Sequence, residues 1–520
     1  MYRRAITITA LLLAVCFSSF GWNTLAQAVT GRISGAVTDG AGAAIAGASV
    51  KIINTSNNIS RVVTTDPNGF YVASSLPVGN YSVVVEHQGF KRATKTGYDL
   101  SADGRLTVDF ALEAGNVSES VEIVGAAGET VNTTSGEVSR VVDQQQVQQL
   151  ALNGRNYLQL TTLVPGVPLL PGNDDQLGLT TSLSVAQSVN GSRTNANSLT
   201  VDGGYNLDSG SNNSQVNNIG IDFIREVNIK TSNFSAEYGR NSGASINIVT
   251  RSGENSFHGS AFEYFRNDKL DANSFINNAN GVAKPTLRFN DFGFAVGGPI
   301  IKDKLFFFGG TEFKYIRRLS SSVSRTMPTQ AERNGDFSAV KGLFLKDPLK
   351  SGNCNATDQT ACFPNNIIPA GQITADGKAI ANVYTAMQGL AASYKDTPTA
   401  NNTVFQQPNP FDSREDLVRI DYRYSDKHTI YGRYTHDKYD LIEPFGTFIN
   451  SQLPTIPTNR LRPGYSVQLG HTWLISSNLI NEAKITGTWN SQHVPPVGDF
   501  CKRDTYGFTF QQLFQGGGRF

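Results

Sequence analysis

The chain of 520 residues carries a formal net charge of +1, and 17% of its residues are charged. This balance gives no overall field that would attract nucleic acid, so nucleic acid is not expected as a partner. Few charges, together with 50 glycines and 10% aromatic residues, favour an extracytoplasmic β-rich protein over a cytosolic enzyme. At roughly 150 residues per domain, the length allows three or four domains.

Residues 1–28 have the features of a secretory signal peptide. A basic start precedes an apolar core at residues 10–15, and small residues follow at Ala26-Gln27-Ala28. The apolar core is too short to cross a membrane, so we predict export and cleavage. Cys16 offers a lipoprotein site as an alternative, which the bulky Val15 before it disfavours. No later run of ~18 apolar residues follows, so membrane insertion would require a closed barrel, which satisfies its backbone hydrogen bonds in lipid.

Residues 29–114 predict a small all-β domain. Short β-rich runs are separated by turn sequences such as Asp66-Pro67-Asn68-Gly69, in which proline fixes φ and Asn and Gly accept left-handed geometry. This spacing indicates a sandwich of about seven strands. The sequence resembles the carboxypeptidase regulatory-like domain, which implies an immunoglobulin- or transthyretin-like accessory fold without peptidase chemistry. A structural spacer and a sugar-binding module are both compatible with this resemblance.

Residues 115–126 predict a linker with a candidate binding segment. Its acidic and β-branched residues are Glu119, Val121, Glu122, Ile123 and Val124. An extended segment of this kind between folded domains can add as a strand to the exposed sheet edge of a partner. The segment resembles a TonB box, which implies that the energy-transducing protein TonB grips it from the periplasm. The alternative is an ordinary last strand of the sandwich.

Residues 127–255 predict an α+β domain. Two short helical pieces are broken at Asn153-Gly154, with Asp143 as a candidate N-cap. A later strand alternates Val227 and Ile229 with polar residues. The run closely resembles the plug domain of TonB-dependent outer-membrane transporters, especially the Oar-like branch. The resemblance rests on motif residues Asn190, Gly191, Arg193, Asp202, Gly203, Glu226, Glu237, Tyr238, Gly239 and Arg240.

The plug resemblance assigns a role to the charged residues of that motif. In the family, residues at the positions of Glu226, Glu237 and Arg240 tie the plug to the barrel lumen. We therefore expect the three side chains to face a barrel wall.

Residues 256–520 predict the first part of an antiparallel transmembrane β-barrel. In residues 417–424, for example, Val418 and Ile420 alternate with Arg419 and Asp421. Apolar and polar residues with period two, and aromatics at the ends, are typical of outer-membrane strands. The same alternation also fits a soluble sandwich packed on one face. The long polar interval at 320–412 favours the barrel, because extracellular loops can be that long.

The predicted barrel is incomplete. Transporters of this type close about 22 strands, and at ~10 residues per strand plus loops the last part of this chain supplies only about seven to nine. Open sheet edges cannot face lipid, so we expect a fragment or a prematurely ended reading frame. The fold class is therefore mainly β: an immunoglobulin- or transthyretin-like sandwich, an α+β plug and an incomplete barrel.

The sequence offers no catalytic constellation. It contains no HExxH, no GxSxG and no phosphate-binding loop, and its six histidines are scattered. Cys354 and Cys362 bracket a short polar loop, which favours a disulfide over a metal site. We therefore predict that the protein is not an enzyme and has no cofactor and no metal.

Together these features predict a TonB-dependent receptor in the outer membrane of a Gram-negative bacterium. It would contact outer-membrane lipid, bind an extracellular substrate and move it inward with energy from TonB and its inner-membrane complex. The alternative is a secreted or surface-attached adhesin that binds carbohydrate through the sandwich. The identity of the substrate cannot be read from the sequence.

Overall fold

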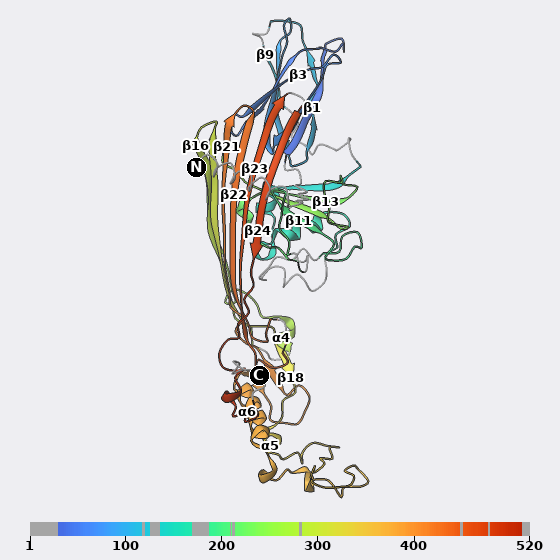
Figure 1. Ribbon diagram of the computed structural model, residues 1–520, viewed down its shortest axis with the longest axis vertical. Helices are drawn as coiled ribbons and strands as arrows, with labels where there is room; N and C mark the ends of the chain where they lie inside the picture. The colour runs from blue at the N-terminus through green and yellow to red at the C-terminus, as the bar shows by residue number, and fades with distance from the viewer. Residues whose placement is uncertain are drawn as a thin grey trace, which may run out of the picture.

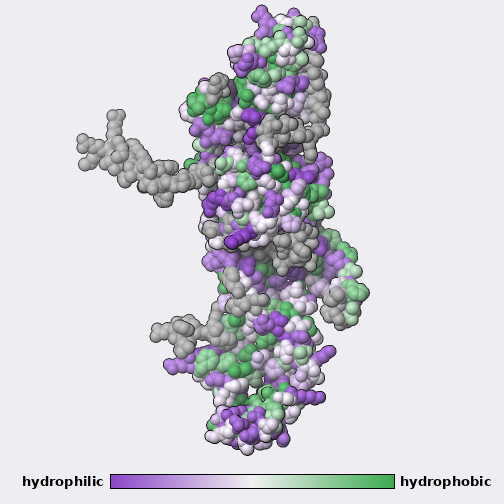
Figure 2. Space-filling model, turned by 90° about the vertical axis from the view of Figure 1, so that its right-hand side faces the viewer, coloured by the Kyte–Doolittle hydropathy of each residue, from purple (hydrophilic) through white to green (hydrophobic). Residues whose placement is uncertain are grey.

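The computed structural model describes residues 30–116, 120–124, 136–168, 187–208, 210, 214–279, 283–447, 451–476 and 479–511. The predicted signal peptide lies outside these residues. Three bodies follow one another along the long axis: a β-sandwich, a plug lying against a tall curved wall of strands, and a group of loops (Figures 1 and 2). The expected mainly β fold class, with an incomplete barrel, is confirmed.

The sandwich consists of two sheets. One has the strand order β4-β1-β7, with β8 also on β1, and the other has the order β3-β2-β5-β6-β9. The strands are β1 (Thr30–Asp39), β2 (Ser49–Asn54), β3 (Ser60–Thr64), β4 (Phe70–Pro77), β5 (Gly79–Glu86), β6 (Arg92–Leu100), β7 (Arg105–Thr107), β8 (Phe110–Leu112) and β9 (Ser120–Val124). Alternate residues such as Ile33 and Val83 are fully buried between the sheets. The period of two along each strand thus builds one core.

Strand β9 contains most of the candidate TonB segment. Its backbone pairs in parallel with β6, from Ser120 beside Arg92 to Val124 beside Thr96. The segment is therefore the last strand of the sandwich in this structure, as the alternative interpretation proposed. Glu119 lies outside the described residues. The role in TonB binding stays a prediction.

The plug is built on a five-stranded sheet with the order β10-β13-β14-β11-β12. Its elements are β10 (Val138–Asp143), α2 (Gln144–Gln149), η1 (Asn153–Arg155), η2 (Tyr157–Leu163), β11 (Ser198–Val201), β12 (Gly204–Tyr205), η3 (Ile221–Phe223), β13 (Ile224–Ser232) and β14 (Ser245–Thr250). Asp143 caps α2 by accepting a hydrogen bond from the Gln146 N–H at 2.8 Å. Gly154 has φ of 64°, a non-helical conformation that interrupts the helical pieces. Val227 and Ile229 point into the plug core.

The wall is one antiparallel sheet with the order β15-β16-β17-β21-β22-β23-β24. The strands are β15 (His258–Asn267), β16 (Leu287–Ile301), β17 (Leu305–Arg318), β21 (Phe411–Ser425), β22 (His428–Glu443), β23 (Thr458–Ser476) and β24 (Leu479–Asn490). Val418 and Ile420 are 49% and 44% exposed on the outer face, whereas Leu417 and Glu415 are buried against the plug. Among the described residues β15 and β24 each have one neighbour, so the sheet has two free edges.

The two ends of the wall carry different connections. Short turns, such as residues 302–304 between β16 and β17, lie at the sandwich end, and residues 319–410 connect β17 to β21 at the other end. We call residues 319–410 the headpiece. Its elements are β18 (Val323–Arg325), α5 (Gln330–Arg333), η4 (Pro364–Asn366), η5 (Ala370–Gln372), α6 (Ala375–Gly389), β19 (Ala391–Tyr394) and β20 (Thr403–Phe405). Met327, Met387 and Phe405 form its small core.

Two further short elements lie in other connections, α4 (Phe275–Ala279) and η6 (Arg503–Thr505). Within the described ranges, none of the helices combines the length and the hydrophobicity needed to cross a membrane.

A disulfide joins Cys354 to Cys362 in the headpiece. Replacing both cysteines with serine should lower the local stability of this loop by about 2 kcal/mol, because the cross-link restricts the unfolded loop. Hydrogen exchange of the Ala361 and Phe363 amides, which bond to backbone carbonyls, measures the change. Cys501→Ser, at a buried free cysteine, is the control and should leave both amides unchanged. Equal protection in all three proteins would contradict the prediction.

Candidate functional site

Arg155 of the plug reaches into the wall. It follows the turn at Gly154 and has a positive φ of 56° itself. Its guanidinium forms an ion pair with Asp222 of the plug and lies 3.5 Å from Asp291 and 3.8 Å from Glu312 of the wall. It also stacks on the rings of Phe262 and Tyr264 of β15, at 4.6 and 4.4 Å. Burial disfavours the charged form, but the surrounding carboxylates outweigh it and raise the pKa of Arg155.

The wall around Arg155 carries a row of acids, Glu312, Glu415 and Asp437, which we call the acid row. Glu312 lies directly opposite Glu415, and Glu415 directly opposite Asp437, on β17, β21 and β22. All three are buried, and like charges opposite each other destabilise a sheet. Lys314 of the wall compensates in part at 3.0 Å from Glu312. The plug adds a second cation beside Glu312, Arg155.

Hydrogen bonds from the plug also reach the acid row. The backbone and side-chain amides of Asn218 donate to Asp437 at 3.2 and 3.0 Å. Nearby, Arg462 of β23 donates to the backbone carbonyl of Gln215 at 2.5 Å. Because buried polar groups need partners, these bonds fix the height of the plug loop against the wall.

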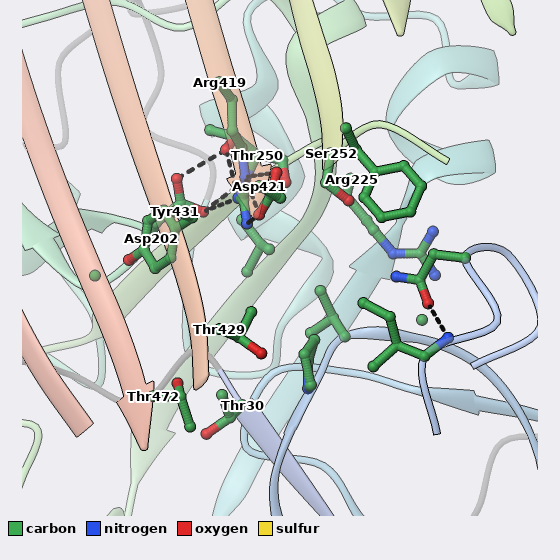
Figure 3. A pocket seen from close by; sticks show the side chains of 18 of the residues that line it. Thr30, Asp202, Arg225, Thr250, Ser252, Arg419, Asp421, Thr429, Tyr431 and Thr472 are labelled. Atoms are coloured by element: carbon green, nitrogen blue, oxygen red, sulfur yellow. Dashed lines mark hydrogen bonds and ion pairs between the residues drawn. The ribbon is translucent and has the colours of Figure 1, made fainter. Parts of the chain in front are cut away.

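A second row, Arg419 and Arg433, carries the opposite sign; we call it the cation row. The two arginines lie opposite each other on β21 and β22. Asp202 of the plug lies 3.5 Å from Arg419 and 2.6 Å from Arg433. Figure 3 shows Asp202 near Arg419, which also pairs with Asp421 of the wall at 2.9 Å. Asp202 also accepts hydrogen bonds from the N–H and hydroxyl of Thr250, at 2.9 and 2.8 Å. Burial opposes its charge, but the arginines and Thr250 outweigh burial and lower the pKa of Asp202.

The backbone of Asp202 is held as well. Gln468 and Lys484 both donate to its carbonyl at 2.9 Å. Asp202 has φ of 48° and is followed by Gly203 with φ of 75°, so the sequence Asp-Gly suits this turn. The plug thus presents an anion to the cation row and a cation to the acid row. Neither row is neutralised by the described part of the wall alone.

Glu226 corrects an expectation from the sequence. It does not face the wall: its carboxylate accepts a hydrogen bond from the Ala102 N–H of the sandwich at 2.7 Å. Asn228 donates to the Ala102 carbonyl at 2.7 Å, and Lys230 pairs with Asp103 at 2.9 Å. Residues two apart share one face of a strand. The even-numbered face of β13 therefore holds the sandwich, while Val227 and Ile229 fill the plug core.

The other motif residues are dispersed over the plug. Asn190, at the turn with Gly191, donates to the Thr231 carbonyl at 3.0 Å. Tyr238 is buried beneath the Lys230 ammonium, 4.6 Å from its ring centre, and burial raises the pKa of its hydroxyl.

Three motif side chains are exposed: Arg193, Glu237 and Arg240. The Arg240 guanidinium stacks on the Tyr205 ring of the plug at 4.7 Å, and Gly239 lies beside it in the chain. The interactions described for Glu237 and Arg240 lie in the plug and the sandwich, not on the wall. The motif therefore does not form one site.

Sequence reasoning missed Arg155, Asp222 and the arginines opposite Asp202. An isolated arginine after Asn-Gly was the available signal for Arg155, and its partners lie on strands far away in the chain. In the described part of the chain, no group of three or more His, Cys, Asp or Glu side chains is arranged to hold a metal ion.

Removing Arg155 should destabilise the plug strongly. Arg155→Met leaves Asp222 buried without its cation. It also leaves Asp291 and Glu312 with Lys314 alone, and we expect the total cost to be about 3–5 kcal/mol. Hydrogen exchange of the buried β14 amides in the full-length protein measures this loss. The control is Arg317→Gln, which breaks an ion pair that is 51% and 43% exposed and should cost less than about 1 kcal/mol. Similar effects of the two variants would contradict the prediction.

The contact between sandwich and plug should weaken as pH rises. Burial raises the pKa of Glu226 from its ordinary 4.5 to about 7. The docked state therefore binds the proton more tightly, so its stabilisation is complete below pH 4.5 and lost as pH rises through 7. We expect the free energy of undocking to fall by about 3 kcal/mol at most between pH 4 and pH 8.

Urea titration of a fluorophore pair, one on the sandwich and one on the plug, measures the free energy of undocking. Glu226→Gln should remove most of its pH dependence. Glu86→Gln, at an exposed ion pair within the sandwich, should retain it. A profile for Glu226→Gln that matches the wild type would contradict the assignment.

Comparison with known families gives two matches. Residues 249–518 match the family described as outer membrane beta barrel domain, and residues 32–113 match the carboxypeptidase regulatory-like domain. The TonB-dependent transporter Oar of Myxococcus xanthus is 32% identical over 295 residues, which are 53% of this chain and 26% of Oar. The chain therefore spans about a quarter of the length of this curated relative.

Solved structures show weaker similarity. The siderophore receptor PirA from Acinetobacter baumannii is 13% identical with a TM-score of 0.37, covering 72% of this chain and 42% of PirA. The outer membrane transporter YddB from Escherichia coli is 10% identical with a TM-score of 0.40, covering 69% of this chain and 39% of YddB.

Proposed function

This chain belongs to the outer membrane beta barrel domain family, and from that premise we propose that it is part of a TonB-dependent outer-membrane receptor that imports an extracellular substrate. The observation that carries the proposal is the charge match between plug and wall. Arg155 lies 3.8 Å from Glu312 of the acid row. Asp202 pairs with both arginines of the cation row, of which Arg419 also pairs with Asp421 of the wall. A plug held against the wall by such charge pairs would block the lumen of the barrel when no substrate is being transported.

The headpiece and the plug surface facing it would bind the substrate. They lie at the end of the wall with the long connections, which in outer-membrane barrels is the extracellular side. The sandwich then lies in the periplasm. The signal peptide would export the chain of a Gram-negative bacterium, and the outer face of the wall, with Val418 and Ile420, would contact lipid.

TonB would grip residues 119–124 and pull the chain toward the periplasm. The next described strand along the chain, β10, lies at the edge of the plug sheet and pairs only with β13. Helix α2 and then Arg155 follow β10. A pull on β10 is therefore transmitted along a short stretch of chain to Arg155, which lies beside Glu312 of the acid row, and withdrawing this cation from the wall releases the plug. The protein acts as a transporter, without a cofactor.

The adhesin alternative is not favoured, because more than half of the chain matches a barrel family. The match to this family does not identify the substrate.

Binding of TonB tests the proposal. Val121→Pro with Ile123→Pro removes two backbone donors from β9, so binding of the purified TonB C-terminal domain should fall at least about tenfold. The measurement uses the protein expressed from its complete gene and purified from outer membranes. Ala400→Pro, in an exposed turn of the headpiece, is the control and should bind normally.

Two outcomes would contradict the proposal in different ways. If the wild type did not bind TonB, the proposed function would be wrong. If the wild type and the proline variant bound equally, TonB would grip another segment.

A further inference from the structure

One turn of the sandwich makes buried polar contacts with the plug. Residues 101–104 connect β6 to β7, and Ala102 in this turn is 2% exposed. Both backbone groups of Ala102 are bonded by the plug, through Glu226 and Asn228, as described above. The neighbouring Asp103 pairs with Lys230. We call this contact the latch.

A further ion pair lies beside the latch. Asp99 at the end of β6 pairs with Arg225 at 3.0 Å, and the Asp99 side chain is 60% exposed. The pair is therefore accessible to solvent and contributes little by itself. It extends the contact along the strand that leads into the turn.

The hydrophobic cores of sandwich and plug are separate. One cluster of buried apolar residues, including Ile33 and Val83, belongs to the sandwich alone. The other, including Val227 and Ile229, belongs to the plug with a few wall residues. The latch consists of hydrogen bonds and ion pairs, so the sandwich can leave the plug without opening either core. Domain contacts of this polar kind are typical of parts that move.

A cavity of about 270 Å³ lies where the sandwich, plug and wall meet (Figure 3). The sandwich contributes Thr30 and the loop around Ser56, the plug contributes Asp202 and Arg225, and the wall contributes Thr472 among others.

Two further hydrogen bonds hold the sandwich over this space. Thr30 donates to Glu482 of β24 at 3.2 Å, and the Asn255 N–H donates to the Ser56 carbonyl at 2.9 Å. Asp202, which pairs with both arginines of the cation row, lines the same cavity. The sandwich therefore covers the side of the plug–wall contact that faces away from the headpiece.

Strand β9, which contains most of the candidate TonB segment, is part of the sandwich that covers the cavity. It pairs with β6 at Arg92–Thr96, and the same β6 strand runs into the latch turn, which begins five residues after Thr96. A pull on β9 therefore acts on the strand that carries the latch.

We propose that the sandwich is a periplasmic lid over the plug–wall cavity, held by the latch and lifted by TonB through β9. The proposal rests on the proposed function for the part played by TonB. The part of the proposal in which the latch keeps the cavity closed does not depend on TonB, because it is argued only from the contacts that the sandwich makes with the plug and the wall. Opening of the lid exposes the Asp202 side of the plug before the plug itself moves.

Thiol labelling tests the lid. Thr472→Cys places a thiol at the cavity, in a Cys501→Ser background so that the buried native thiol does not contribute. The protein, expressed from its complete gene, is purified into lipid discs and labelled with a bulky polyethylene glycol maleimide. With the latch intact we expect slow labelling.

A loosened latch should speed labelling. Asp99→Asn with Asp103→Asn weakens both ion pairs to the plug, and we expect a rise of at least about fivefold in rate. The matched control is Glu86→Gln with Glu113→Gln, which removes two ion pairs inside the sandwich and should leave the rate unchanged. Equal rates in the loosened and control proteins would overturn the proposal.

A locked latch gives an independent result that does not depend on the fold of the loosened variant. Ala102→Cys with Asn228→Cys, oxidised before labelling, should bring the rate at Thr472→Cys below that of the intact latch. Reduction of the lock should raise the rate again, measured by mass spectrometry of the peptide that carries Thr472→Cys so that the released latch thiols do not contribute. Labelling that is unaffected by the lock would also overturn the proposal.

Cells with and without functional TonB separate the two proposals. With a porin-permeant biotin maleimide, labelling of Thr472→Cys should be faster when TonB is present, and the oxidised lock should abolish the difference. A TonB-dependent difference that persists in the locked protein overturns the lid. If there is no difference and purified TonB also fails to bind, the proposed function fails, while the disc experiment still decides whether the sandwich closes the cavity.

Discussion

The plug and the wall bury charged side chains against each other. Each of these side chains needs a partner of opposite charge, either in the same body or in the other one. Taking an ion out of water is costly unless it is paired and hydrogen-bonded. The acid row and the cation row place like charges directly opposite one another on neighbouring strands. The described wall does not balance either row alone. Arg155 and Asp202 therefore determine where the plug sits, at which height, and with which face toward the strands.

The strand period makes this arrangement compatible with a lipid-facing exterior. On β21, Glu415 and Arg419 are four residues apart and point to the plug, while Val418 and Ile420 point outward. A register shift of one residue would bring the apolar residues inside and the charges outside. The same register that places the charges in rows across β17, β21 and β22 thus also places Val418 and Ile420 on the outer face. Lipid contact and plug recognition are specified together by one alternating pattern.

Local patterns predicted the elements but not the partners across them. The alternation around Val418, the cap at Asp143 and the turn at Asp202-Gly203 are all short-range features, and each has a direct physical cause in its neighbours. The partners of Asp202 lie on β21 and β22, more than 200 residues along the chain. Nothing near Asp202 in the sequence encodes them, because they meet Asp202 only when the plug packs against the wall.

Glu226 shows the same limit most clearly. The alternation of β13 placed it correctly on the face opposite Val227, but it could not tell which body covers that face. The resemblance suggested the wall, whereas the structure places Ala102 of the sandwich there. The alternation along a strand predicts which residues share a face of the sheet. Which domain packs against that face is determined only by how whole domains pack together.

The order of the strands along the chain sets the order in which the contacts respond to a pull. The Asp99–Arg225 pair is exposed on the Asp99 side, and exposed ion pairs contribute at most about 1 kcal/mol each. The Lys230–Asp103 pair of the latch is largely buried, as is Arg433 with Asp202, and breaking a buried pair costs about 3–5 kcal/mol. Strand β9 precedes β10 along the chain. A pull applied at β9 therefore reaches the latch first, and the charge rows hold the plug until the sandwich has moved.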